Sequence, residues 1–268
     1  MGLSLVFGVL KMLNVAHGEL IMLGGYVGFW LFAIWGIDPF LSLAPSALAL
    51  FLAGGLLYRL LFSRLLSVPE ETKLKNSILI GFGLALVLQT LAIRAWTADE
   101  RVISTSYAGA VLPIGGVVVP LARLGALAVA FLTLGGLHLF IHRTYPGKAI
   151  RAIAEDVDAA YLSGIPVPAV FLTAFGLGSA LAGIAGTLVG MTDAVSPAIG
   201  LSWTLKALIV VVLGGLGSVF GTFVAGVALG VAEALSGFFL GNAYREVMGL
   251  ALFLLVLALR PQGLFVRR

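Results

Sequence analysis

The chain has 268 residues, of which 60% are hydrophobic and only 10% are charged. Soluble domains are about 45 to 50% apolar and about 25% charged, so the composition excludes a soluble globular protein and indicates a polytopic membrane protein. The basic residues behind the net charge of +4 fall in short segments between apolar runs, and we expect no nucleic-acid binding. The absence of cysteine excludes disulfides, thiolate catalysis and cysteine-ligated metal sites.

The first element is an apolar run at residues 2–10, which is too short to cross a bilayer on its own because a spanning helix needs about 20 apolar residues. The polar sequence NVAHGE follows it at 14–19. Further along the chain, apolar runs bounded by Gly, Pro and charge predict complete spans at 18–36, 40–62, 77–95, 120–142, 167–190 and 243–260.

The run at 204–236 is too long for one crossing and is interrupted by LGGLGS at 213–218. We therefore predict an all-α, polytopic integral membrane protein with a single domain over 1–268. About seven to eight spans are expected, including discontinuous helices near residues 2–35 and 204–236.

The loops give an orientation. If the LGGLGS break separates two passes, three groups of basic residues fall on the same side of the membrane, namely Arg59, Arg64, Lys73 and Lys75, then Arg143, Lys148 and Arg151, and finally Arg260, Arg267 and Arg268. By the positive-inside rule this side and the C-terminus are cytoplasmic, in a multi-pass protein of the cell (inner or cytoplasmic) membrane. Arg94, Arg101 and Arg123 fall on the outer side against the rule, with Asp99 and Glu100 close by.

The segment YPGKAIRAIAEDVDAAYLSGIP at 145–166 predicts a short amphipathic helix on the cytoplasmic side. Apolar or small residues recur at steps of three and four, and charged residues occupy the other face, which carries Arg151, Glu155, Asp156 and Asp158. Gly164 and Pro166 give a stop signal. Such a helix could lie on the membrane surface, but anionic lipid selects basic polar faces, so the acidic face favours docking on another protein.

Motifs for covalent chemistry or metal binding are missing from the sequence. YPGKAI has neither the spacing nor the hydroxyl of a Walker A motif, so we do not expect the chain to hydrolyse ATP itself. No nucleophile and base pair of an intramembrane protease is present, and no catalytic residue is assigned. His138 and His142 stand four residues apart, as in metal-binding pairs, but without an accompanying Glu or Cys they favour an interfacial histidine pair over a metal site.

Glu19, Lys206 and Glu233 are the ionisable residues within apolar runs. A charge near the bilayer centre costs at least about 2.5 to 3.5 kcal/mol, so each needs a partner, a cavity or a function. Two plainer alternatives stay open, because Glu233 lies near the outer end of its segment and Lys206 could extend its ammonium toward the membrane surface.

The two breaks predict a site in the membrane. Backbone that leaves helical geometry at membrane depth is tolerated only where protein buries it or where it lines a cavity. Transporters place substrates at such breaks, and the two breaks share a design typical of a parallel internal repeat. We therefore assign a candidate substrate pathway to Asn14, His17, Glu19, Gly214, Gly215, Gly217 and Ser218. The alternative is that the glycine-rich breaks are tight helix turns buried in packing.

Several stretches together resemble the permease subunit of branched-chain amino acid ABC importers. These are GLSLVFGVLKMLNVAHGELIMLGGY, GKAIRAIAEDVDAAYLSGI, the SP at 196–197, VVVLGGLGSVFGTFVAGVALGVAEAL and the terminal RPQGLF. They cover nearly the whole chain in the order of the family, and the N-A-H-G type motif is similar to that of the H-type subunit.

The resemblance implies a subunit that translocates Leu, Ile or Val and performs no enzymatic reaction and binds no cofactor. Its partners would be a sister permease in a heterodimer, two cytoplasmic ATPase subunits, an extracytoplasmic solute-binding protein and membrane lipid. The coupling helix at about 147–165 would dock on the ATPase through Arg151, Glu155, Asp156, Ala159 and Gly164.

Relatives usually carry a further hydrophobic helix before the position that matches Gly2, so the resemblance predicts that this chain lacks the first transmembrane helix of the family. The N-terminus also shows no basic region followed by a cleavage site, and no signal peptide is predicted. Related permeases carry urea, short amides or other amino acids, which leaves those substrates open. A stand-alone channel or secondary transporter is a further alternative, although it would more typically bury a chain of carboxylates near the midplane.

Overall fold

The computed structural model describes the chain except for residues 106, 108, 115–116, 261–262 and 266–268. Within these described residues, six helices are long and apolar enough to cross a membrane: α2 (His17–Trp35), α3 (Pro39–Leu57, continued to Leu66 by short π and 3-10 turns), α4 (Glu70–Trp96), α5 (Leu121–Arg143), α8 (Val167–Thr192) and α10 (Val219–Phe239). The shorter helices are α1 (Gly2–Leu10), α6 (Tyr145–Glu155), α7 (Val157–Leu162), α9 (Ile199–Gly214) and α11 (Arg245–Leu259). With the shorter apolar helices α9 and α11, the helices confirm the predicted polytopic all-α fold and its break between 214 and 219. The complete span predicted at 243–260 is wrong in length, because α11 has only 15 residues and a spanning helix needs about 20.

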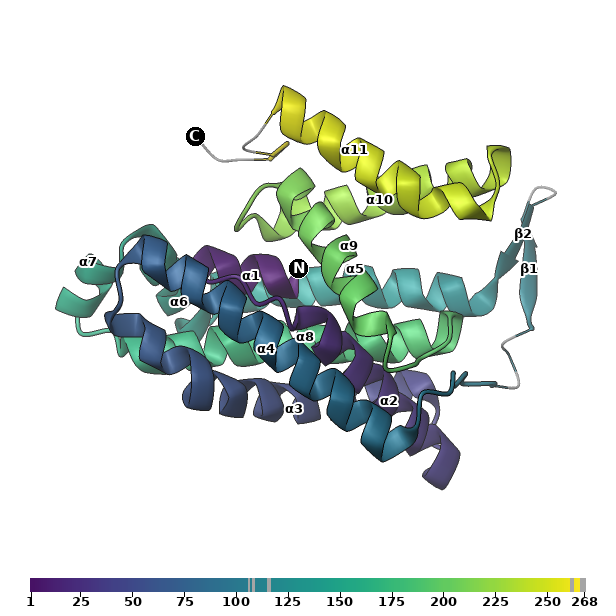
Figure 1. Cartoon of the computed structure of the whole chain (residues 1–268), viewed down its shortest axis with the longest axis horizontal. Coiled ribbons are helices and arrows are strands. Elements are labelled where there is room, and N and C mark those ends of the chain that lie inside the picture. The colour runs from purple at the N-terminus through teal and green to yellow at the C-terminus, as the bar shows by residue number, and fades with distance from the viewer. Residues whose placement is uncertain (106, 108, 115–116, 261–262, 266–268) are drawn as a thin grey trace.

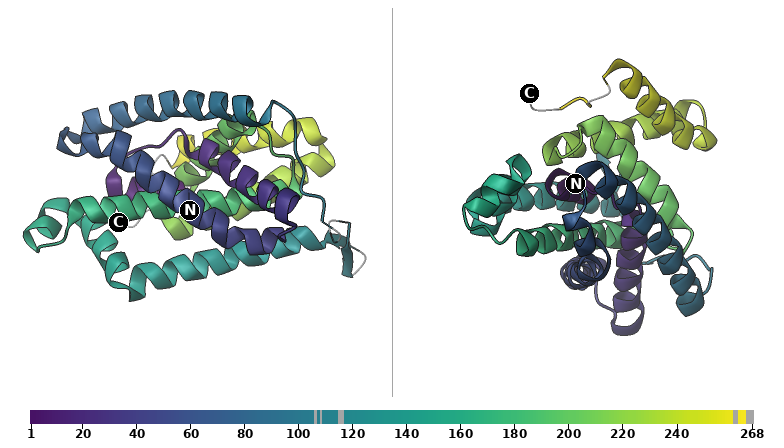
Figure 2. Two further views of the ribbon diagram at one scale, coloured as in Figure 1. Left: turned by 90° about the horizontal axis from the view of Figure 1, so that it is seen from below. Right: turned by 60° about the vertical axis from the view of Figure 1, so that its left-hand side comes forward.

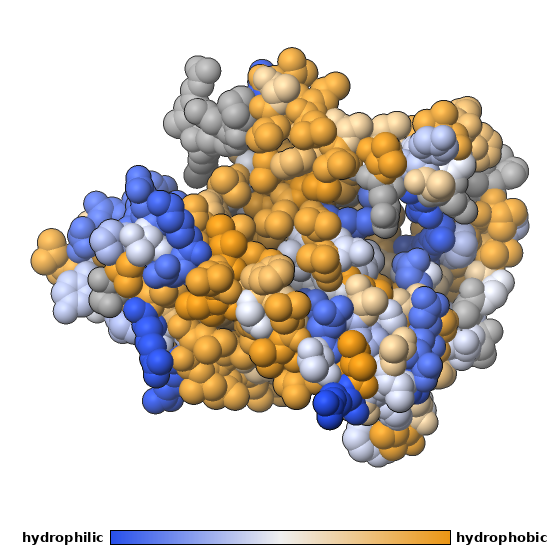
Figure 3. Space-filling view, in the orientation of Figure 1, coloured by the Kyte–Doolittle hydropathy of each residue, from blue (hydrophilic) through white to orange (hydrophobic). Residues whose placement is uncertain are grey.

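The long helices lie side by side as a bundle, with α6 and α7 at one end (Figure 1). A small antiparallel hairpin of β1 (Val111–Ile114) and β2 (Val117–Pro120) lies at the opposite end. Figure 2 shows the same bundle from two further sides. An apolar band covers the middle of the surface and hydrophilic residues gather toward the ends, as expected of a protein that faces lipid around its waist (Figure 3).

Helix α8 lies at the centre, where α2 and α3 approach it closely. A Cβ at Gly24 of α2 would lie 2.6 Å from Gly183 Cα of α8, so a side chain at this position would push the two helices apart. Ser46 of α3 donates to the carbonyl oxygens of both Gly24 and Gly183 at 3.2 Å, and Thr187 of α8 donates to the Gly24 oxygen at 3.2 Å. Small residues and short hydroxyl side chains therefore hold the three helices together, as is common between membrane helices.

The predicted single helix over 145–166 is wrong in one respect, because the structure has two helices that meet at Asp156. The Asp156 Oδ1 accepts hydrogen bonds from the backbone N–H groups of Asp158 (2.9 Å) and Ala159 (3.0 Å). Asp is a favoured N-cap and a poor residue for a helix interior, so Asp156 ends α6 and begins α7. The amphipathic unit is therefore bent.

Candidate functional site

The first break joins α1 to α2 through residues 11–16, and Asn14 closes it. Its side-chain Oδ1 accepts from the N–H of Ala16 at 3.1 Å, and its carbonyl oxygen accepts from the N–H of His17 at 3.2 Å. Asn14 is only 2% exposed. An Asn side chain that bonds backbone two residues further on forms an Asx turn, which explains why this residue type occurs where the helix restarts.

Helices α4 and α9 cover the break and bond three further backbone groups. The Thr204 hydroxyl of α9 accepts from the N–H of Gly18 at 2.9 Å and donates to the carbonyl oxygen of Val15 at 2.9 Å. On the other side, the N–H of Leu13 donates to the Ser77 hydroxyl of α4 at 3.0 Å. Non-helical backbone at this depth is thus buried by protein, as the membrane environment requires.

His17 and Glu19 lie in the first turn of α2 and are 5% and 2% exposed. The Glu19 carboxylate lies directly on Gly200 of α9, where a Cβ would overlap it. Among the described residues, its Oε2 atom has no hydrogen-bond partner. Both side chains are enclosed by the chain itself, and their assignment to the substrate pathway stays a prediction.

The second break, between α9 and α10, is a turn built from glycines. Gly215 and Gly217 have φ values of 92° and 88°, which L side chains rarely adopt. Ser218 caps α10, since its hydroxyl accepts from the N–H of Gly221 at 3.0 Å. Gly214 is the last residue of α9 and is buried where the turn closes on α10. The predicted pathway residues of this break therefore form the tight turn between α9 and α10.

The structure brings the two discontinuous elements together. A Cβ at Gly8 of α1 would lie 3.0 Å from Gly217 Cα, so α1 packs directly on the glycine turn. Gly217 and Ser218 line a cavity of about 1300 Å³ that also reaches α1, α5 and α6. Its polar lining residues are Lys11, His138, His142, Arg151, Glu155 and Ser218. Asn14, His17 and Glu19 do not line this cavity.

His138 and His142 stack with their ring centroids 4.1 Å apart at the wall of the cavity. The Nδ1 atom of His142 lies 2.9 Å from the carbonyl oxygen of His138. The two rings pack against each other and one nitrogen engages the helix backbone, which agrees with the expected histidine pair at the end of a span.

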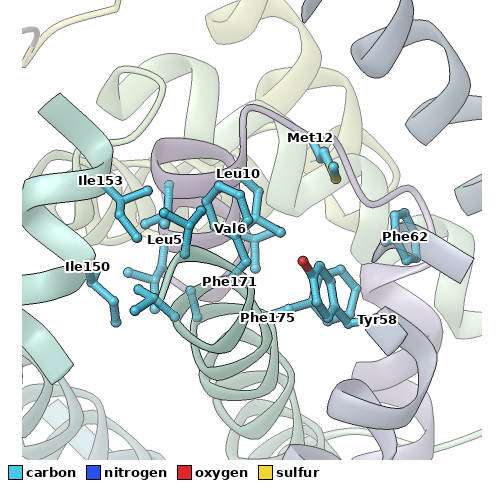
Figure 4. Packing of buried hydrophobic residues seen from close by; sticks show 14 of the residues in the cluster. Leu5, Val6, Leu10, Met12, Tyr58, Phe62, Ile150, Ile153, Phe171 and Phe175 are labelled. Atoms are coloured by element: carbon cyan, nitrogen blue, oxygen red, sulfur yellow. The ribbon is translucent and has the colours of Figure 1, made fainter. Parts of the chain in front are cut away.

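Helix α6 is attached to the bundle through its apolar face. Ile150 and Ile153 are 2% and 1% exposed and pack in one cluster with Leu5 of α1 and Phe171 of α8 (Figure 4). Helix α6 therefore packs against α1, which in turn contacts the glycine turn.

Helix α7 leaves its outer surface uncovered. The five predicted coupling residues Arg151, Glu155, Asp156, Ala159 and Gly164 are all exposed. Beside them, Tyr161 and Leu162 are 70% and 87% exposed. Gly164 has a φ of 78°, which ends α7, and a Cβ at this position would meet nothing within 4 Å, so its surroundings are open. The end of the molecule thus presents apolar side chains next to carboxylates.

Lys206 and Glu233 form an ion pair that the sequence did not predict, since each residue was considered separately. Lys206 Nζ of α9 lies 3.1 Å from Glu233 Oε2 of α10. The residues are far apart in sequence and lie on opposite arms of the hairpin, so only the position of the LGGLGS turn could have suggested that they meet.

At the opposite end of the bundle, both the backbone and the side chain of Arg101 contact neighbouring segments. Its backbone pairs with Val195 through two hydrogen bonds of 2.8 Å, and its guanidinium lies 5.3 Å from the centre of the Trp30 ring. Nearby, the Tyr107 hydroxyl donates to Asp38 Oδ2 at 2.7 Å, and Asp38 also caps α3. Burial, followed by this hydrogen bond to Asp38, raises the pKa of Tyr107 to about 12.

Among the described residues, six helices long and apolar enough to cross a membrane, two interrupted elements packed on each other and an exposed amphipathic unit at one end define the class of the chain as a polytopic membrane protein. The sequence matches the family profile described as "Branched-chain amino acid transport system / permease component" over residues 1–257. The chain therefore belongs to this family of transport permeases, and the resemblance drawn from its motifs is confirmed.

Individual relatives agree with the family. The chain is 34% identical to the high-affinity branched-chain amino acid transport system permease protein BraD of Pseudomonas aeruginosa, over 99% of this chain and 90% of the relative. It is 31% identical to LivH of Escherichia coli, over 99% and 89%. A shorter match to LivM of Salmonella typhimurium is 38% identical over 44% of this chain and 28% of the relative. No solved structure matches the chain.

Proposed function

We propose that this chain is a transmembrane subunit of an ATP-driven importer and that it carries leucine, isoleucine and valine into the cell. The observation behind the substrate is the similarity to BraD and LivH, which are named as high-affinity branched-chain amino acid permeases and align with nearly the whole chain. The similarity to LivM supports a related permease as the second membrane subunit. A solute-binding protein would deliver substrate on the side of the β1–β2 hairpin.

The coupling surface is α7 with the exposed end of α6, which we assign to the cytoplasmic side together with the C-terminus. Of the two ATPase subunits, one would dock on this surface and the other on the second permease. Tyr161 and Leu162 are exposed apolar side chains that a partner would bury, and Glu155 and Asp156 can pair with basic groups around them. Small residues at 159 and 164 allow the partner to approach closely.

The packing supports a route from this surface to the membrane interior. A push on α7 moves α6, whose residues Ile150 and Ile153 contact α1 through Leu5. Helix α1 then bears on the glycine turn at Gly8 and Gly217. Because closely packed interiors transmit displacement rather than absorb it, ATP-driven closure of the ATPases would shift the two interrupted elements against each other.

The experiment is the double substitution Glu155→Arg with Leu162→Glu in the assembled importer in proteoliposomes. Neither side chain is buried, so we expect the complex to insert normally, while leucine uptake and leucine-stimulated ATP hydrolysis fall together. Glu71→Arg, an exposed charge reversal at the start of α4, is the matched control and keeps both activities. Uptake and ATP hydrolysis at wild-type levels in the double variant would show that the ATPase docks elsewhere.

A further inference from the structure

The proposed function assigns no occupant to the cavity of about 1300 Å³ beside the glycine turn. Parts of α1, α5 and α6 and the first turn of α10 line it together with Leu264 and Phe265. Sites for small molecules usually enclose about 300 to 1,000 Å³, so this cavity has room for a larger ligand.

The polarity of the cavity changes along α5. The lining positions of this helix recur every three or four residues, so one face of α5 is turned to the cavity. Phe131 and Leu134 lie toward the middle of the helix, and His138 and His142 lie toward its end at α6. From Phe131 to His142 the wall runs about 16 Å along the helix axis. A cavity that is apolar at one end and polar at the other suits an amphiphile.

The apolar part of the wall is left uncovered by the chain. Phe131 of α5 and Phe220 of α10 are 54% and 62% exposed, and Leu264 and Phe265 also have large exposed fractions. Helices α5 and α10 are both long and apolar enough to cross a membrane. Exposed apolar side chains on such helices are the surface that acyl chains contact in a bilayer.

The polar part of the lining is mostly basic. Lys11 and Arg151 carry two positive charges and the two histidines offer imidazole nitrogens, against the single carboxylate of Glu155. Among the described residues, neither Lys11 nor Arg151 takes part in an ion pair, and both are exposed. Both charges are therefore free to pair with an anionic ligand in the cavity.

Lys11 also occupies a backbone conformation that does not favour lysine. Its φ of 54° lies in the left-handed region, which Gly and Asn adopt more readily. Its N–H donates to the Phe7 carbonyl oxygen at 3.0 Å and ends α1. The backbone alone would favour Gly or Asn here, so an ammonium needed at the cavity would account for the lysine.

We propose that this cavity binds one anionic phospholipid. The phosphate pairs with Lys11 and Arg151, and an acyl chain lies along Phe131 and Phe220. Basic pockets between membrane helices recognise anionic headgroups, because Lys and Arg form charge-assisted bonds to phosphate oxygens. An acidic protein segment could pair with the same charges, but the exposed apolar wall favours the lipid. The proposal does not depend on which solute the chain carries.

The test uses the purified full chain and the complex that co-purifies with it, stripped of lipid in detergent and titrated with phosphatidylglycerol. Native mass spectrometry counts the lipids that remain bound, and this readout needs neither leucine nor ATP. We expect one phosphatidylglycerol to bind more tightly than the others, and phosphatidylcholine not to replace it. A failure of transport would therefore leave this result unaffected.

Two matched double variants examine the charges. Lys11→Gln with Arg151→Gln should weaken binding of this lipid by at least about tenfold, because each basic group near an anionic lipid contributes about fivefold. Lys75→Gln with Lys148→Gln removes the same net charge from exposed lysines that do not line the cavity, and should leave the lipid bound. Equal lipid binding in the two double variants would overturn the proposal.

A second pair of variants examines the apolar wall. A Cβ at Gly135 or at Gly136 meets nothing within 4 Å, but of the two only Gly135 lines the cavity. Gly135→Trp should therefore displace the lipid, and Gly136→Trp should keep it. Lipid retained in Gly135→Trp would contradict the proposed position of the acyl chain.

Two other occupants would be recognised in the same experiment. Glycerol 3-phosphate that competes as strongly as phosphatidylglycerol would show a site for a free anion, without a role for the acyl chain. Lipid that binds the full chain but is absent from the co-purified complex would show that another subunit covers the cavity. Either result would overturn the proposal.

Discussion

Thr204→Val removes the single hydroxyl that joins α9 to the first break while keeping the shape of the side chain. Thr204 is 1% exposed, and its Oγ1 both accepts from Gly18 N–H and donates to the Val15 carbonyl oxygen. The substitution leaves two buried backbone groups without partners. Each costs about 1 to 3 kcal/mol, and hydrogen bonds in membrane proteins lie toward the lower end, so we expect a total loss of about 2 to 4 kcal/mol.

The assay is reversible unfolding of the purified protein in mixed micelles, followed by circular dichroism. Thr204→Ser keeps the hydroxyl and should lose only about 1 kcal/mol for the buried methyl group. Thr173→Val is the matched control, because this exposed hydroxyl bonds only to the Ala169 carbonyl of its own helix, and we expect a change within about 0.5 kcal/mol. A Thr204→Val protein as stable as the wild type would refute the view that α9 holds the break in place.

Three further predictions concern other parts of the fold. Gly186→Val forces a side chain onto the Ile21 carbonyl oxygen and should lower the free energy of unfolding by about 3 kcal/mol. At Gly135 an added Cβ meets nothing within 4 Å, so Gly135→Val should change stability only by the difference in helix propensity. Thermal unfolding of the two variants measures the difference between them. Asp38→Ala removes the cap of α3 and should lower stability by about 1 kcal/mol in the same assay. The raised pKa of Tyr107 means that the folded state holds the phenol proton between pH 10 and about 12 while the unfolded state loses it, so stability falls as pH rises through this window. Tyr107→Phe should remove that part of the alkaline slope, and an unchanged slope would contradict it.

The positions of the spans could be predicted because each depends on one local property, the length of an apolar run. The predicted span at 18–36 is α2 at His17–Trp35, and the break at LGGLGS follows from glycines that interrupt an overlong run. The third span begins earlier than predicted, at Glu70, because charged residues at the membrane surface extend the helix without adding hydropathy.

The bend at Asp156 was predictable in principle but was not predicted. The periodicity of apolar residues over 145–166 shows which residues share a helix face. It does not show where a capping residue such as Asp156 interrupts the backbone hydrogen bonds of the helix. The β1–β2 hairpin also had a signal, since VLPI and VVVP are separated by two glycines in the sequence.

The contacts that define the candidate site could not be predicted from the sequence. Thr204 meets Gly18 across 186 residues, and Lys206 meets Glu233 across 27, and neither separation follows a helical period. Such contacts depend on how the helices pack in three dimensions. Sequence pattern therefore identified the two breaks, and the structure was needed to show what covers them.

The central claim is that leucine crosses the membrane through this chain only when ATPase subunits drive it. The most direct measurement is uptake of labelled leucine into proteoliposomes that contain the chain alone or the complete importer, with the binding protein outside and ATP inside. We predict uptake only by the complete importer, and loss of that uptake when either ATP or the binding protein is left out. Leucine uptake by the chain alone without ATP would identify a channel or a secondary transporter and contradict the account.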